Sequence, residues 1–297
     1  MTTRGHDRLG LGLAALGRPA YITSGRGRDV GGARSIDEMR ARTAEVLDAA
    51  YACGVRYFDA ARSYGRAEEF LADWLASRPD VTDIDIASKW GYRYVGDWRM
   101  DAGVHEVKDH SLGAFETQID ETRALLGDRL DLYQVHSVTE DSPVLSDSEL
   151  QRALAELRDT GVRVGLSTSG PKQADVIRAA LEIDVDGTRL FSSVQSTWNL
   201  LESSSGAALS EAHDAGVAVV VKEVFANGRL APGEVDGTPQ SMSVVRMAQE
   251  MGVGIDQLAV AAALQQSFSP RVLSGAVSAA QIRSHVAGAH IEVPSSM

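Results

Sequence analysis

Short apolar runs alternate with longer segments of helical period along the chain. Eight runs rich in β-branched and other apolar residues predict strands at Leu9–Leu16, Val55–Asp59, Asp83–Ser88, Leu130–His136, Val162–Ser167, Phe191–Gln195, Val217–Lys222 and Arg271–Ala276. Segments of helical period predict helices at Ile36–Cys53, Glu68–Ser77, Leu112–Leu126, Glu149–Asp159, Gln173–Leu181, Ala207–Ala215, Val244–Met251, Gln257–Gln266 and Ala279–Val286. The repeated unit is a strand followed by a helix.

The ends of the helical segments agree with this division. Gly54, Gly161 and Gly216 each stand between a helical segment and the next strand, where a left-handed residue ends a helix. Asp147 or Ser148 can cap the helix that begins at Glu149. Eight strand–helix units predict an α/β protein whose parallel eight-stranded sheet closes into a (β/α)8 TIM barrel, as a single domain over residues 1–297.

The competing architecture is an open, doubly wound sheet that binds a dinucleotide. Its first strand would be followed by a GxGxxG turn. The segment GRPAYITSGRGRDVGGARS that follows the first strand here does not have that spacing, so the barrel is favoured. The part of this segment from Arg26 to Ser35 is expected to be a flexible loop near the end of the barrel.

Composition and charge argue against several classes of function and site. With 41 acidic and 29 basic residues, the chain carries a net charge of −12, which disfavours binding to nucleic acid. A single cysteine, Cys53, excludes an internal disulfide and a multi-cysteine zinc site, and we expect no metal. Because no apolar run reaches secretory or transmembrane length, we expect a cytoplasmic protein without a membrane partner, whose oligomeric state stays open.

Titratable residues stand where three consecutive predicted strands end. The second strand ends at Asp59, with Tyr64 five residues later, the third is followed by Lys89, and the fourth ends at His136. In a barrel these positions meet at one face. A lysine cation stabilises a neighbouring phenolate, and a carboxylate compensates the burial of that lysine. The four residues therefore predict a tyrosine acid that protonates a carbonyl oxygen, while the imidazole orients the substrate.

At these residues the chain resembles the aldo-keto reductase family. The segments that carry the resemblance are GVRYFDAARSYG at Gly54–Gly65, IASKWG and DLYQVHS. The resemblance implies a barrel that binds NAD(P)H across its open end without a Rossmann fold. It also implies that Tyr64 is the general acid, that Asp59 and Lys89 tune it, and that His136 orients the carbonyl. Ser167, Thr168 and Gln195 would hold the nicotinamide amide.

Two stretches depart from the family's pattern. In KEVFANGRL, Lys222 replaces the tyrosine that stacks on the nicotinamide, so Phe225 or Trp198 would have to supply an apolar face. Lys222 is then either a second functional cation or a partner of Glu223. After the eighth strand, Gly275 and Gln281 stand where relatives carry cations for the 2′-phosphate of NADP. Arg283 and Arg271 are the nearby cations that remain. Both NAD(H) and NADP(H) therefore stay open.

Aromatic residues suggest where a substrate would lie. The loop WGYRYVGDWR brings Trp90, Tyr92 and Trp98 together, and with Trp198 they are candidates for a wall that contacts a sugar or ring. The alternative is that the loop packs on itself.

The leading hypothesis is an NAD(P)-dependent oxidoreductase that interconverts a small-molecule carbonyl, as an aldehyde, ketone or sugar, and the corresponding alcohol. An alternative is a catalytically weak, NAD(P)-binding regulatory or sensor subunit on the same barrel. A third hypothesis makes Lys89 a Schiff-base lysine. The neighbouring Asp59 argues against it, because a paired ammonium is a poor nucleophile.

Overall fold

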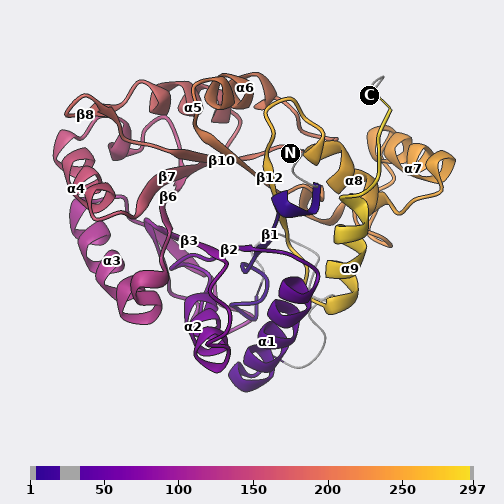
Figure 1. The fold of residues 1–297 in the computed structure, drawn as a ribbon, viewed down its shortest axis with the longest axis horizontal. Coiled ribbons are helices and arrows are strands. Elements are labelled where there is room, and N and C mark those ends of the chain that lie inside the picture. Colours follow the sequence, from indigo (N-terminus) through magenta and orange to yellow (C-terminus); the bar gives the residue numbers. More distant parts are fainter. Residues whose placement is uncertain (1–4, 21–33, 295–297) are drawn as a thin grey trace.

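Eight parallel strands close into a barrel with helices around it (Figure 1). The computed structural model describes residues 5–20 and 34–294, so most of the stretch 26–35 lies outside the described residues. Around the barrel the strands are β1 (Leu9–Gly12), β2 (Tyr57–Asp59), β3 (Asp85–Trp90), β6 (Leu132–Val138), β7 (Arg163–Thr168), β10 (Ser193–Thr197), β11 (Ala218–Lys222) and β12 (Arg271–Ser274). This order confirms the predicted (β/α)8 barrel.

The helices follow the strands in the order that the sequence predicts. They are α1 (Ile36–Ala52), α2 (Ala67–Ser77), α3 (Leu112–Leu126), α4 (Ser148–Asp159), α5 (Gln173–Leu181), α6 (Gly206–Asp214), α7 (Pro239–Met251), α8 (Ile255–Leu264) and α9 (Ala279–Gly288). Helix α7 lies outside α8 in the connection between β11 and β12 (Figure 1). None of the described helices is long and apolar enough to cross a membrane.

Local chemistry explains where these elements begin and end. Gly54, Gly161 and Gly216 have φ values of 89°, 98° and 79°, as expected for residues that turn the chain from a helix into a strand. Ser35 and Glu38 form a reciprocal capping box at the start of α1. The carboxylate of Asp147 accepts two backbone N–H groups at the start of α4.

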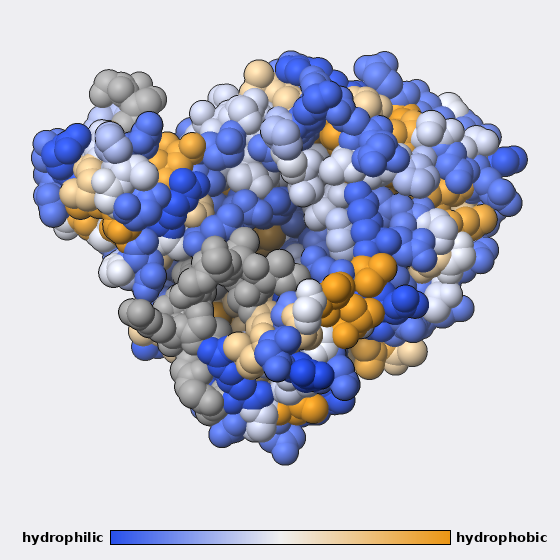
Figure 2. Space-filling model, turned by 180° about the vertical axis from the view of Figure 1, so that it is seen from behind, coloured by the Kyte–Doolittle hydropathy of each residue, from blue (hydrophilic) through white to orange (hydrophobic). Residues whose placement is uncertain are grey.

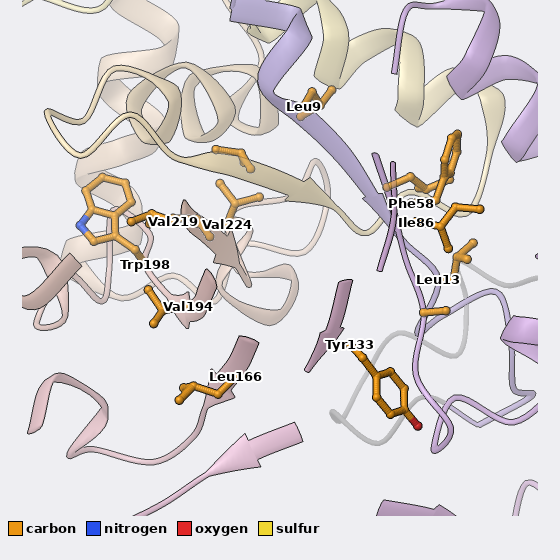
Figure 3. Close-up of a cluster of buried hydrophobic side chains, with 14 of the residues drawn as sticks. Leu9, Leu13, Phe58, Ile86, Tyr133, Leu166, Val194, Trp198, Val219 and Val224 are labelled. Atoms are coloured by element: carbon orange, nitrogen blue, oxygen red, sulfur yellow. The ribbon is translucent and has the colours of Figure 1, made fainter. Parts of the chain in front are cut away.

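The side chains of each barrel strand alternate between two apolar layers. Outward-facing residues such as Phe58, Leu166 and Val194, which are labelled in Figure 3, belong to the large apolar cluster that also contains residues of the surrounding helices. Inward-facing residues Tyr57, Ala87, Leu132, Val220 and Leu273 form a smaller cluster inside the barrel. This alternation leaves the inward positions at the two strand ends for polar groups. We call the carboxyl end of the strands the mouth and the opposite end the base.

Two details differ from the prediction. The chain leaves β1 at Gly12 instead of continuing to Leu16, because Leu13 O accepts the N–H groups of Leu16 and Gly17 in a turn. The aromatic loop after β3 is not irregular, because β4 (Tyr92–Tyr94) and β5 (Glu106–Lys108) pair in an antiparallel hairpin beside the mouth. A second short hairpin joins β8 (Asp184–Val185) and β9 (Thr188–Arg189).

Candidate active site

A buried ion pair occupies the centre of the mouth. Lys89 is 0% exposed, and its Nζ donates to Asp59 Oδ1 and, at 3.0 Å, to Ala60 O. The other oxygen of Asp59 accepts Gln195 Nε2 at 2.8 Å and Gln134 Nε2 at 3.3 Å. Four inward-facing residues from four strands thus hold the carboxylate and the ammonium in fixed positions.

Tyr64 lies between this pair and His136. Lys89 Nζ is 5.1 Å from the centre of the Tyr64 ring. The hydroxyl of Tyr64 is 3.5 Å from His136 Nε2, and the two rings meet edge to face. The structure therefore brings together the four residues for which sequence predicts acid chemistry, and a substrate oxygen near the Tyr64 hydroxyl would also meet the imidazole.

A β-bulge aims His136 into the mouth. The pairing of β6 with β7 gains one residue between Val135 and Val138, and Ser137 has a φ of 54°. Hydrogen bonds hold the backbone on both sides of the bulge. His110 Nε2 donates to His136 O at 2.8 Å, and Ser137 N donates to Ser167 Oγ at 2.8 Å.

Burial sets the protonation of the basic groups. It lowers the pKa of Lys89, although the charge of Asp59 opposes this. Burial, together with the charges of Lys89, Lys222 and Arg18, lowers the pKa of His136 well below its usual range. His136 is therefore neutral near pH 7 and acts by hydrogen bonding at its ring nitrogens.

Arg18 is a residue near Tyr64 that the sequence analysis did not single out. Its guanidinium lies 5.5 Å from the centre of the Tyr64 ring and donates to Ser63 O and Glu106 Oε2. It thereby connects the loops that follow β1 and β2 to the hairpin. No motif signals this role, since Arg18 stands alone in a loop and its partners come from other loops.

Two glycines fix the loop that carries Tyr64. A Cβ atom on Gly17 would lie 2.2 Å from Tyr64 O, and a Cβ atom on Gly65 would lie 2.4 Å from Gly17 O. Gly65 also has a φ of 61°. The first two loops of the mouth therefore approach backbone to backbone, where a side chain would not fit.

The mouth holds a cavity that continues from Tyr64 toward the end of β12. Figure 2 shows this face with a hollow near its centre. The cavity is lined by Gly12, Asp59, Tyr64, Gln195, Lys222, Glu223, Phe225, Ser274 and Gly275, among others. Open space surrounds Gly275 where a Cβ would project. A dinucleotide could approach the backbone closely at this position.

The groups near this cavity fit a nicotinamide amide. Because Asp59 binds Gln195 Nε2, the Oε1 atom of Gln195 is the one that can accept an amide N–H. Ser167 Oγ accepts Ser137 N, and its own proton can be donated to an amide oxygen. Gln195 lines the cavity, whereas Ser167 is not among the residues that line it and contacts the bulge.

At the end of β11, Lys222 combines features of both alternatives considered for it. Its Nζ donates to Thr197 Oγ1 at 2.8 Å and to Glu223 Oε1 at 3.0 Å, so it is paired and also lines the cavity. Phe225 lines the cavity too, and its ring lies 4.4 Å from that of His285. Phe225 is therefore the aromatic residue near Lys222 that can offer an apolar face.

Three further residues considered for the cofactor make other contacts in the structure. Thr168 is buried behind β7, where its hydroxyl donates to Ser196 Oγ. Gln281 accepts the backbone N–H of Val277 and caps that loop. Arg271 begins β12 and pairs with Asp85 at the base, so it is at the wrong end of the barrel to meet a 2′-phosphate at the mouth.

The predicted aromatic wall divides into separate environments. Tyr92 packs edge to face on His136 and borders the mouth. Trp98 lies farther out on the hairpin loop, where its Nε1 donates to Arg34 O. Trp90 is 0% exposed and packs on Phe115, and Trp198 is buried near Phe268. Trp90 and Trp198 thus belong to the core, because they face the helices and not the cavity.

Comparison with known proteins agrees with the barrel fold. The chain is 28% identical over 260 residues to a pyridoxal 4-dehydrogenase of Microbacterium luteolum, which is 77% of this chain and 72% of that protein. The aldo-keto reductase AKR11C1 of Bacillus halodurans, solved in its holo form, superposes with a TM-score of 0.73 at 21% identity. That match covers 97% of this chain and 88% of the other.

A further solved relative was crystallised with a cofactor. It is an aldo/keto reductase of Klebsiella pneumoniae in complex with NADP and acetate, with a TM-score of 0.66 and 20% identity over 97% of this chain and 87% of that one. The model of the aldo/keto reductase family matches residues 8–297. The chain is therefore a member of the aldo/keto reductase family of oxidoreductases.

Proposed function

We propose that the protein interconverts a carbonyl compound and the corresponding alcohol with a nicotinamide cofactor, and that Tyr64 exchanges the proton. The observation that carries this proposal is the placement of Tyr64 between the buried Lys89–Asp59 pair and a neutral His136. The relative named pyridoxal 4-dehydrogenase supports the inclusion of aromatic aldehydes and their alcohols among the substrates, beside sugars.

The side chains at the mouth have separate roles in this reaction. A bound NAD(P)H would supply the hydride that reduces the carbonyl carbon. The substrate oxygen would lie within hydrogen-bond distance of both the hydroxyl of Tyr64 and Nε2 of His136, and Tyr64 donates its proton as negative charge develops on that oxygen. The phenolate that results is stabilised by the ammonium of Lys89, which Asp59 keeps charged despite its burial. In the alcohol-oxidising direction each transfer is reversed.

Replacement of Tyr64 by phenylalanine tests this assignment. The Tyr64→Phe variant removes the acid and leaves the cavity, so we expect turnover to fall by about a hundredfold or more while the dissociation constant of the reduced cofactor changes little. Activity would be measured with pyridoxal, aromatic aldehydes and aldoses, and cofactor binding by quenching of protein fluorescence. Retained turnover in this variant would exclude Tyr64 as the proton donor.

The cofactor is either NAD(H) or NADP(H), and the loop after β12 supports NAD(H). The positions that the family resemblance assigns to the 2′-phosphate hold Gly275 and Gln281. Of the two cations that the sequence leaves nearby, Arg271 is at the base and Arg283 remains. A phosphate monoester is normally bound by charge-assisted hydrogen bonds. We expect NADH to bind more tightly than NADPH in paired fluorescence titrations, and the reverse order would overturn this preference.

Lys222 supports a second candidate, the NAD(P)-binding sensor. A paired lysine stands where the family resemblance places a stacking aromatic residue. The Tyr64→Phe experiment separates the two candidates. If the protein is a sensor, the parent and the variant would both bind the cofactor, and neither would turn over any of the carbonyl substrates.

A further inference from the structure

The base of the barrel contains a second polar cavity, opposite the mouth. It has a volume of about 220 Å³ and lies below the inner apolar cluster, near the short helix that precedes β1. Its polar lining includes Arg8, Tyr57, Arg163, Ser193, Ser269 and Arg271. The proposed function uses none of these residues.

Two hydroxyl groups are buried in this cavity without a partner. Tyr57 and Ser193 are each 1% exposed, and neither Tyr57 Oη nor Ser193 Oγ has a hydrogen-bond partner among the described residues. Buried hydroxyls are normally satisfied by protein, water or a ligand. Burial and the charge of Asp59 raise the pKa of Tyr57 well above its usual range, so its hydroxyl stays a donor.

The ring of Tyr57 is held in place from two sides. A Cβ atom on Gly10 would lie 2.8 Å from Tyr57 Cδ1, so the glycine makes room for the ring. The guanidinium carbon of Arg271 lies 4.2 Å from the ring centre. The hydroxyl of Tyr57 and the guanidinium of Arg271 therefore face the cavity together.

Positive charge exceeds negative charge around the cavity. Arg163 and Arg271 share one carboxylate, that of Asp85. Asp131 also interacts electrostatically with Arg163, while its Oδ2 accepts the N–H of Ile86. Arg8 donates to Ser269 Oγ and Pro270 O, and in the described part of the chain no carboxylate pairs with it. Three guanidinium groups thus face two carboxylates.

We infer that the base of the barrel binds a small oxyanion such as phosphate. Guanidinium groups at the wall and hydroxyl donors at the inner end provide the charge-assisted and neutral hydrogen bonds that such an anion accepts. The cavity is also large enough, since a single water needs only about 10–15 Å³ of such space. The site lies at the opposite end of the barrel from Tyr64, so it can be filled without blocking the mouth.

Titration with inorganic phosphate tests this site in the full chain. We expect saturable heat in calorimetry and a rise in melting temperature that potassium chloride of equal ionic strength does not reproduce. The Arg8→Gln variant removes the cation that pairs with no carboxylate of the described residues, and it should bind phosphate about tenfold more weakly. Lys222→Met is the matched control at the other end of the barrel and should bind phosphate as the parent does.

Tyr57→Phe removes only the buried hydroxyl. In phosphate-free buffer we expect this variant to melt at the same temperature as the parent or higher, since it loses an unpaired polar group. In phosphate it should gain less stability than the parent. The inference is overturned if phosphate does not bind, if Arg8→Gln and Tyr57→Phe bind it as the parent does, or if Lys222→Met abolishes binding.

Discussion

The two ends of the barrel use the same kind of ion pair in opposite surroundings. At the mouth, the side chains of Lys89 and Asp59 are 0% and 2% exposed. At the base, Asp85 is 26% exposed, and its partners Arg163 and Arg271 are 42% and 31% exposed. Coulombic interactions are several times stronger where water is excluded. The buried pair can therefore change the acidity of a neighbouring tyrosine, whereas the hydrated pairs can attract an ion from solution but contribute little to stability.

Removing one carboxylate at each end gives the largest expected contrast. Asp59→Asn leaves Lys89 buried with no counter-charge, so we expect a loss of about 3 kcal/mol in the free energy of unfolding. Turnover should fall by about a hundredfold or more, because the neutral lysine no longer stabilises phenolate. Asp85→Asn breaks two hydrated pairs and should cost about 1 kcal/mol with turnover nearly unchanged. Urea unfolding and steady-state kinetics measure both. Equal effects at the two ends would contradict the comparison.

His110 extends the ordered region of the mouth beyond the residues that face the substrate. Its bond to His136 O holds the bulge, so His110→Leu should lower kcat by about tenfold without weakening cofactor binding. His110→Gln retains an N–H donor and should recover most of the rate. If the two variants have the same kcat, the hydrogen bond does not position His136.

Acidification should destabilise the protein through two buried histidines of the mouth. Burial lowers the pKa of His110 from 6.5 to about 4, so the unfolded chain binds a proton at this residue that the folded chain does not. Stability then falls as the pH drops through this range, by roughly 2 kcal/mol between pH 7 and 4.5 for this residue. The lowered pKa of His136 acts in the same direction. Urea unfolding at several pH values should show that the free energy of unfolding falls less steeply with decreasing pH in His110→Gln than in the parent. If it falls equally steeply in both, His110 is not a source of the pH dependence.

A small effect, on stability alone, is expected at the glycine that accommodates Tyr57. Gly10→Ala places a methyl group against the ring and should cost about 1–2 kcal/mol in stability. We expect turnover at the mouth to be nearly unchanged, because the apolar cluster separates the two ends. Thermal unfolding measures the loss of stability, and steady-state kinetics with the best substrate measures turnover. A large loss of turnover would mean that the ends are coupled.

The eight strands were predictable because their apolar runs are short and the glycines between the elements are regular. Asp59, Lys89 and His136 were predictable as neighbours because each stands at or next to the end of a strand. The base site was not predictable in the same way. Tyr57 reads as an ordinary strand residue, and the sequence suggests Arg271 only as a cation near a 2′-phosphate. Only the closed barrel with its register brings Arg271 and Arg163 to the same aspartate.

Side-chain direction was the other feature that the sequence left unspecified. Trp90 and Tyr92 are two residues apart in the aromatic loop, but Trp90 ends β3 facing the helices and Tyr92 begins the hairpin beside His136. Thr168 follows Ser167 directly and points to the opposite side of β7. A shift of one position along a strand reverses the face, and the family resemblance alone does not show where the chain turns.

The backbone contact between Gly17 and Gly65 has a consequence for redesign of substrate choice. Variation of the loops at a barrel mouth changes the chemistry that the fold supports. Here the first loop cannot be replaced by one with a side chain at position 17 without displacing the carbonyl of Tyr64. Chimeras with relatives should therefore transfer the first and second loops as one unit, with both glycines retained.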